Sequence, residues 1–381
     1  MSRTVVLGAG FGGIAVATEL RRLLGDGHEV VLVDRRDEFS MGLRKLWELV
    51  GIGTVADGSR SRRLLAGNGI RFVPASVEAI DPVARAVRCD GTDLDADFLV
   101  VALGAEPRPD VIPGMTEHAH DVWDRARVHE ARAALEAFGG GRVAVVIAGA
   151  PYPCPPAPYE CAMLVDEWLR DRELRERTEL TVSTFQPILL PNAGSEGSAW
   201  LAEQLASRGI DARTGRKVER FEPGRVHYAD GELDADLVFG VPPHRVPAVV
   251  AGSALSDDGH WIRVDPGTLA TRFSRVFAIG DVTQIPLANG LPLPKAGVIA
   301  EREGVRVAAA IAAEVGGGEG PAPFDGHGHC FIEMGRSSAT LIEGAFFAEP
   351  EPLVHLREPS AENAEQKRAF EAERLRRWFG R

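Results

Sequence analysis

The chain has 381 residues, of which 45% are hydrophobic, and a formal net charge of −12. This composition excludes a disordered chain, the length predicts about two or three domains, and the acidic balance argues against nucleic acid as a partner. Four cysteines in so long a chain are too few for a disulfide scaffold and indicate a reducing compartment.

The first predicted elements are a strand, a glycine-rich loop, a helix and a second strand. Residues 4–8 (TVVLG) form the first strand, and the second, EVVLV, ends at Asp34. Gly8 allows a tight turn, Gly10 lets the backbone approach a pyrophosphate, and Gly13 permits close packing of helix on strand. The helix N-terminus offers free N–H groups to phosphates, and Asp34 can accept hydrogen bonds from ribose hydroxyls. The order of these elements predicts a dinucleotide site rather than a glycine turn that binds nothing.

Three later segments resemble motifs of flavoproteins with two dinucleotide-binding domains. Residues 75–80 (ASVEAI) resemble the strand whose backbone meets adenine, at Val77. Residues 99–105 (LVVALGA) resemble the strand–glycine segment at which the chain leaves the FAD domain. Residues 277–282 (FAIGDV) resemble the second flavin motif, whose aspartate, here Asp281, binds the ribityl chain.

These matches predict an α/β fold with two Rossmann-like dinucleotide-binding domains, as in glutathione reductase, and a short C-terminal segment. We expect residues 1–106 and 245–320 to form a discontinuous FAD domain, residues 107–244 an NAD(P)-like domain, and residues 321–381 the C-terminal segment. The residues expected to bind FAD are Gly8, Gly10, Phe11, Gly12, Gly13, Asp34, Arg35, Lys45, Val77, Ala102, Gly104, Gly280, Asp281, Lys295 and Ala296.

The inserted domain lacks the sequence features of a nucleotide site. Its first predicted strand, 142–148, is followed by the proline-rich segment PYPCPPAPYECA (151–162), where glycines are expected. Proline has no N–H group to donate to a phosphate. The next strand, LTVSTF, leads to Gln186 and provides no acid for a ribose. We therefore expect no bound NAD(P)H, and a different site on the same scaffold.

The proline-rich segment carries a closer resemblance. CPPAPYE (154–160) resembles the Cys-Pro-Pro-Gly-Pro-Tyr-Glu segment of flavocytochrome c sulfide dehydrogenases and its equivalent in sulfide:quinone oxidoreductases. GDVTQIPLANGLPLPKAG (280–297) and GHCFIEMG (328–335) resemble their flavin-proximal stretch and the segment with their second cysteine. The resemblance covers nearly the whole chain. It implies an FAD enzyme that oxidises sulfide, or a related sulfur compound, and passes electrons to a quinone.

In that family two cysteines form a disulfide beside the flavin, and Cys154 and Cys330 occupy the matching positions. The implied chemistry begins with HS⁻ attack on the disulfide, which leaves a persulfide on Cys154 and a flavin-facing thiolate on Cys330. From the residues alone, each could instead be an ordinary buried side chain. We interpret Cys89 as structural, and a predicted helix holds Cys161 too far from Cys154 for a bridge.

Other residues match positions with family roles. Glu160 matches a glutamate proposed to handle protons near the thiols, although it could be an ordinary first-turn helix acid. Lys295, before the predicted helix 296–315, is expected to stabilise negative charge on the reduced flavin, unless it is a surface lysine. Phe331 matches a position near the quinone. Because residues 37–47 contain no cysteine, we expect FAD to be non-covalent.

The last predicted element is a charged helix over 364–381 that ends in Trp378 and Phe379 among arginines. This end either enters a membrane interface or caps the fold with its narrow apolar face. We expect no secretory signal, because a strand begins at Arg3, and no membrane span, because no apolar run reaches about 18 residues. We therefore expect a cytoplasmic protein, with peripheral contact at the inner face of the membrane as an alternative.

Several alternatives stay open on the sequence alone. The rival functions are an NADH:quinone oxidoreductase of similar fold and a flavin-binding redox sensor that does not turn over. Arg44 and Lys45 could contact flavin or pyrophosphate or lie on a solvated face. The HGHC segment at 327–330 lacks a fourth ligand, so we expect no metal site.

Overall fold

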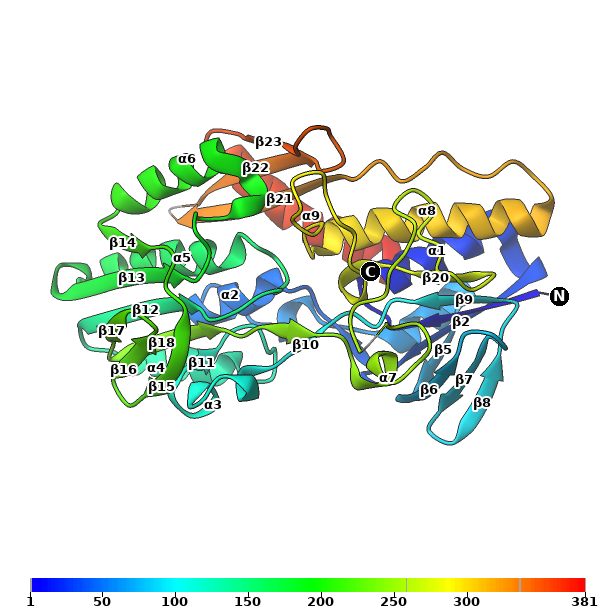
Figure 1. Cartoon of the computed structure of the whole chain (residues 1–381), viewed down its shortest axis with the longest axis horizontal. Helices are drawn as coiled ribbons and strands as arrows, with labels where there is room; N and C mark the ends of the chain where they lie inside the picture. Colours follow the sequence, from blue (N-terminus) through cyan, green and yellow to red (C-terminus); the bar gives the residue numbers. More distant parts are fainter. Residues whose placement is uncertain (1, 258, 336, 381) are drawn as a thin grey trace.

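Two five-stranded parallel sheets form the two halves of the computed structural model, which describes residues 2–257, 259–335 and 337–380 (Figure 1). The first sheet has the strand order β20-β9-β1-β2-β5. Its central strands are apolar runs buried on both faces, as parallel strands covered by two layers require. The bounds are β1 (Ser2–Leu7), β2 (His28–Asp34), β5 (Arg71–Pro74), β9 (Phe98–Val101) and β20 (Val276–Ala278).

Two helices and a small sheet cover the two faces of the first sheet. Val6 packs among side chains of α1 (Phe11–Leu24) and α8 (Gly297–Gly316). Val5 and Leu7, which point the other way, pack on an antiparallel sheet. That sheet consists of β6 (Val77–Asp81), β7 (Ala86–Cys89) and β8 (Thr92–Asp95).

The second sheet repeats this plan with the strand order β11-β18-β12-β13-β14. Helices cover one face, and the antiparallel sheet β15-β16-β17 covers the other. The strands are β11 (His120–Asp121), β12 (Gly141–Ile147), β13 (Thr178–Thr184), β14 (Ile210–Arg213), β18 (Leu237–Val241), β15 (Val218–Glu222), β16 (Arg225–Tyr228) and β17 (Gly231–Asp234). The helices on the first face are α4 (Val128–Ala137), α5 (Ala157–Asp171) and α6 (Gly194–Ala206), whereas α3 (Met115–His118) packs with the antiparallel sheet on the other face. Two Rossmann-like units of the same design confirm the predicted fold class.

The chain passes between the two sheets through a pair of short antiparallel strands, β10 (Glu106–Pro107) and β19 (His244–Arg245). The remaining short elements are β3 (Glu38–Phe39), α2 (Leu43–Val50), β4 (Arg60–Ser61) and α7 (Ala248–Ala251).

The C-terminal residues form a third, antiparallel sheet and a long helix. β21 (His327–Gly335), β22 (Ser338–Ala345) and β23 (Leu353–Leu356) are hydrogen-bonded in this order. The sheet lies beside α5 of the second half, whereas α9 (Ala361–Phe379) runs back to the first half (Figure 1). The C-terminal segment therefore joins the two halves where they meet.

The end of α9 corrects the idea of a membrane-inserted tip. Trp378 and Phe379 are only 1% and 6% exposed. Trp378 packs against Phe11 and Phe39, with ring centroids 5.5 and 5.6 Å away. The end of the helix therefore caps the fold, as the second alternative predicted, because the two aromatic side chains are buried against it. Within the described part of the chain, no helix is long and apolar enough to span a membrane.

Candidate functional site

The predicted dinucleotide loop opens on a cavity of about 820 Å³ at the carboxyl ends of β1 and β2. Gly8 has φ +95°, and a Cβ there would lie 2.2 Å from the Ala102 carbonyl oxygen. A Cβ on Gly13 would lie 1.8 Å from the Gly8 oxygen, whereas one on Gly10 would meet no atom within 4 Å. The three glycines thus serve the turn, the helix packing and the open approach that the sequence predicts. The lining includes Gly8, Gly10, Asp34, Arg35, Lys45, Val77, Ala102 and Gly104.

Asp34 is fixed at the end of β2 by backbone donors. Its Oδ2 atom accepts a hydrogen bond from Ala9 N at 2.8 Å, and its Oδ1 atom accepts one from Arg36 N at 2.9 Å. Arg62, which no sequence motif indicated, is buried here and donates from Nε to the Ala9 carbonyl at 2.9 Å. The side chain therefore braces the glycine loop from within the fold.

A second cavity of about 370 Å³ adjoins the first and shares Gly10, Lys45, Ala102 and Gly104 with it. It brings together most of the predicted chemical residues, although they come from four distant segments of the chain. Its lining includes Phe11, Gly12, Cys154, Glu160, Gly280, Asp281, Lys295, Ala296, Cys330 and Phe331. Two adjoining cavities that share lining residues fit a dinucleotide with a flat ring system at one end.

The neighbouring residues Arg44 and Lys45 have different surroundings. Lys45 lines both cavities and donates from Nζ to the Trp123 carbonyl at 2.6 Å. Burial lowers its pKa. Arg44 instead makes a two-pronged ion pair with Glu371 of α9. Of the two residues, only Lys45 is therefore in position to contact a bound nucleotide.

Lys295 is buried, at 8% exposure, so its interpretation as a surface lysine is wrong. Its Nζ atom donates to the carbonyls of Asp281 and Thr283 at 2.6 and 2.9 Å and lies 3.7 Å from the Trp261 ring centroid. Burial lowers the pKa of Lys295 to about 8. The ammonium thus holds the turn after β20, and its expected action on the flavin stays a prediction.

Glu303 of α8 holds the same turn from the other side. Its Oε2 atom accepts a hydrogen bond from Gly280 N at 2.6 Å. Burial raises the pKa of Glu303 to about 8. Sequence reasoning missed this residue, although Ile299, Glu303 and Val307 share a helical stripe whose outer members are apolar.

The proline-rich loop before α5 is folded against the first half of the molecule. Cys154 N donates to the Lys295 carbonyl at 2.7 Å, and His244 N donates to the Pro151 carbonyl at 2.7 Å. Trp123 Nε1 donates to the Pro153 carbonyl at 3.2 Å. Cys154 has φ +57°, an uncommon conformation for a residue with a side chain. In a nucleotide-binding unit, the loop at this position is open and binds a phosphate. Here the loop is instead folded against neighbouring residues, and it carries a cysteine.

Cys154 and Cys330 come together in the smaller cavity, as thiols hydrogen-bonded to each other. The hydrogen bond to Cys330, together with burial, raises the pKa of Cys154. The same hydrogen bond lowers the pKa of Cys330. Cys330 is therefore the thiol that ionises first. Cys89 and Cys161 are buried with pKa values raised mainly by burial, which suits the structural role expected of Cys89.

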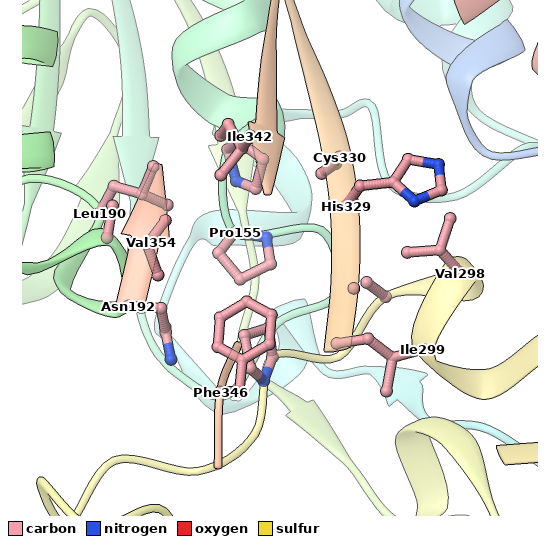
Figure 2. A pocket seen from close by; sticks show the side chains of 15 residues that line it. Pro155, Leu190, Asn192, Val298, Ile299, His329, Cys330, Ile342, Phe346 and Val354 are labelled. Carbon is pink, nitrogen blue, oxygen red and sulfur yellow. The ribbon is translucent and has the colours of Figure 1, made fainter. Parts of the chain in front are cut away.

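Cys330 also borders a small apolar cavity of about 50 Å³ (Figure 2). Cys330 and Ile342 are cross-strand partners in β21 and β22, and Pro155 follows Cys154 on the facing loop. The neighbouring His329 also lines this cavity (Figure 2). The apolar lining, which also includes Leu190, Ile299, Phe346 and Val354, suits a small uncharged species.

Glu160 of α5 and Phe331 of β21 line the same cavity and contact different residues of α9. Glu160 is 4% exposed, and its Oε1 atom accepts a hydrogen bond from Lys367 Nζ at 2.5 Å. Burial raises the pKa of Glu160. Phe331 contacts Phe370 of α9, with ring centroids 6.4 Å apart. Sequence reasoning missed Lys367 and Phe370, because it considered only the end of their helix, at Trp378 and Phe379, as a point of contact.

Among the residues that the structure describes, no group of three or more His, Cys, Asp or Glu side chains could hold a metal ion. The fold and the two cavities define a flavin-type dinucleotide enzyme with a cysteine pair. The model of the pyridine nucleotide-disulphide oxidoreductase family matches residues 2–308, and the chain belongs to this family. Its cofactor is FAD.

Comparison with individual proteins shows which members of the family the chain resembles. The sulfide-quinone reductase of Aquifex aeolicus is 27% identical over 375 residues, which cover 91% of this chain and 83% of that protein. The solved structure of the Aquifex aeolicus sulfide:quinone oxidoreductase has a TM-score of 0.90 at 25% identity and covers 100% of this chain and 92% of that chain. The mouse mitochondrial sulfide:quinone oxidoreductase is 24% identical over 91% of this chain and 78% of its own length. A type II NADH:quinone oxidoreductase of Staphylococcus saprophyticus is 23% identical over 80% of this chain and 81% of its own length.

Proposed function

We propose that this protein is an FAD-dependent oxidoreductase of the sulfide:quinone type, which oxidises sulfide or a related sulfur compound and passes the electrons to a quinone. The observation that carries this function is the meeting of Cys154 and Cys330 in the cavity that continues from the dinucleotide site. The likeness to sulfide:quinone oxidoreductases over nearly the whole chain supports it.

The residues that would hold FAD line the two cavities or lie in the glycine loop beside them. The open backbone at Gly10 suits the pyrophosphate, Asp34 suits the adenosine ribose, and Asp281 lies at the turn next to the compact cavity. Bound there, FAD supplies a two-electron acceptor beside Cys330.

The cysteines perform the sulfur chemistry in this proposal. HS⁻ attacks the Cys154 sulfur of a Cys154–Cys330 disulfide, so that one S–S bond forms and the disulfide bond breaks. Cys154 is left as a persulfide, and Cys330 leaves as a thiolate that carries the electron pair. The lowered pKa of Cys330 supports this division of roles, because the better leaving group is the sulfur of lower pKa.

Phe331 and Phe370 supply an aromatic surface at the rim of the same cavity, where His329 lies 6.0 and 6.1 Å from the two rings between centroids. Such a surface suits a flat quinone ring. We propose this rim as the quinone site.

The rival NADH:quinone function lacks a matching site. The loop over 151–156 is hydrogen-bonded to Lys295 of the first half and to His244 of the connecting strand β19, and its prolines have no N–H groups to donate. NADH has no glycine loop to approach in this unit.

The test is steady-state turnover of purified holoenzyme with a short-chain quinone and either sulfide or NADH. We expect many turnovers with sulfide and background rates with NADH. Turnover with NADH alone would establish the rival enzyme, and a single reduction without turnover would establish the sensor.

A further inference from the structure

The ammonium group of Lys295 is surrounded by an aromatic ring as well as by hydrogen-bond acceptors. Its Nζ atom lies 3.7 Å from the centroid of the Trp261 ring. It also donates to the carbonyls of Asp281 and Thr283, at 2.6 and 2.9 Å. Because Lys295 is only 8% exposed, the indole face and the two carbonyl oxygens replace most of the water that would hydrate this charge.

Trp261 is attached to the same turn through the next residue in the chain. Ile262 is fully buried, and its N donates to the Val282 carbonyl at 3.1 Å. The Ile262 carbonyl accepts a hydrogen bond from Gln284 N, also at 3.1 Å, which completes a parallel bridge to Thr283. The ring and the carbonyls that surround the ammonium therefore belong to one hydrogen-bonded unit.

Within this unit, Lys295 and Asp281 line the compact cavity next to the cysteine pair. Trp261 lies outside the described lining of that cavity and contacts Lys295. The ring therefore reaches a bound flavin through the lysine, so its role is one of positioning.

The ionisable groups that face Lys295 are Asp281 on the turn, Glu303 of α8 and His244 of β19. Burial lowers the pKa of Lys295 to about 8, and the two carboxyl groups oppose this shift. Burial also lowers the pKa of His244 to about 4, so this imidazole is neutral near pH 7. Because burial disfavours the ammonium, its charge near neutral pH depends on the groups in contact with it, which include the Trp261 ring.

We propose that Trp261 is a positioning residue of the flavin site, whose ring keeps the Lys295 amine protonated and fixed beside the cavity, where its charge stabilises the reduced flavin. A fixed positive charge favours the anionic reduced form, so the ring raises the reduction potential of FAD. This inference goes beyond the proposed function, because it requires bound FAD and neither sulfide nor a quinone.

The first test is an NMR titration of the holoenzyme labelled with ¹³C at lysine Cε. The chain has four lysines, which keeps the spectrum simple: Lys45, Lys217, Lys295 and Lys367. We expect the Lys295 midpoint to fall by about one pH unit in Trp261→Leu, and by less in Trp261→Phe, which retains an aromatic face. The exposed Lys217 is the internal reference. Trp200→Leu, which removes a partly buried indole from the second unit, is the matched control and should leave the Lys295 midpoint unchanged.

The second test is the midpoint potential of bound FAD, measured by anaerobic equilibration with redox dyes. Lys295→Met should shift the ratio of oxidised to reduced flavin about tenfold toward the oxidised form, which is about 30 mV for a two-electron couple. Trp261→Leu should shift the potential in the same direction by a smaller amount. In the Lys295→Met background, Trp261→Leu should cause no further shift, because the ring acts through the lysine.

Replacement of tryptophan by a fluorinated tryptophan provides the test if Trp261→Leu does not fold. Fluorine weakens the negative potential over the indole face and nearly preserves its shape. The Lys295 midpoint should then fall, and the Lys217 midpoint should stay unchanged.

An unchanged Lys295 midpoint in Trp261→Leu would overturn the proposal, as would an equal shift in Trp200→Leu. A change of potential that persists when Trp261→Leu is added to Lys295→Met would also overturn it, because the ring would then act without the lysine. Since neither measurement contains sulfide, a protein that shows the expected shifts and does not oxidise sulfide would contradict the proposed function alone.

Discussion

The two Rossmann-like units differ in the loop that follows their first strand. Between β1 and α1, glycines bring the backbone close to Ala102 and leave open space above Gly10. Between β12 and α5, prolines fold the loop onto the other half of the molecule, and Cys154 N donates to the Lys295 carbonyl. The scaffold is the same in both units, and the loop decides whether it offers N–H groups to a phosphate or a thiol to a redox cavity.

The first unit also differs from the second because the end of the C-terminal helix α9 packs against its core. Trp378 is buried among Phe11 and Phe39, whereas Trp200 on α6 of the second unit is partly exposed. We expect Trp378→Ala to lower the free energy of unfolding by about 3–5 kcal/mol, since it opens a large cavity. Trp200→Ala is the control, with a smaller loss expected in denaturant titrations. Equal losses would contradict the closing role of α9.

Glycine substitutions compare the two loops directly. In Gly13→Ala the new Cβ would lie 1.8 Å from a backbone oxygen that cannot move away alone. We expect a loss of about 3 kcal/mol and of bound FAD, measured by thermal unfolding and by flavin content. In Gly149→Ala the Cβ would lie 2.9 Å from the ring of Pro243, which can shift. Flavin content should then be unchanged, and a loss of FAD there would show that the second loop also supports the cofactor.

Glu303, which lies in the first unit, is expected to make the free energy of unfolding depend on pH. Its pKa in the folded protein, about 8, lies above the ordinary value of 4.5, so the unfolded chain releases this proton first as pH rises. The contribution to stability is therefore lost progressively between about pH 4.5 and pH 8. Glu303→Gln should reduce the fall in unfolding free energy over this window by up to about 5 kcal/mol, since one pKa unit corresponds to about 1.4 kcal/mol. Parallel stability curves for the two proteins would show that Glu303 is not the responsible group.

The fold and the dinucleotide loop could be predicted because their signals are local. The roles of Gly8, Gly10 and Gly13 depend on the glycine loop and the helix that follows it, so their spacing in the sequence is enough to predict these roles. Glu303, Trp261 and Lys367 could not be selected, because their roles depend on partners in distant segments. The position of Trp378 likewise depends on Phe11 and Phe39 at the other end of the chain. The cysteine pair was predicted through resemblance, since sequence spacing gives no information about the distance between two side chains.

The central claim is that the second loop presents a redox cysteine to the cavity shared with Cys330. Anaerobic rapid mixing of the holoenzyme with sulfide, followed by flavin absorbance, tests it most directly in wild type, Cys154→Ala and Cys330→Ala, with Cys161→Ala as the control. We predict fast flavin reduction in wild type and Cys161→Ala and a loss of at least about 10³-fold in the other two variants. Reduction that survives both substitutions, or none in the wild type, would contradict it.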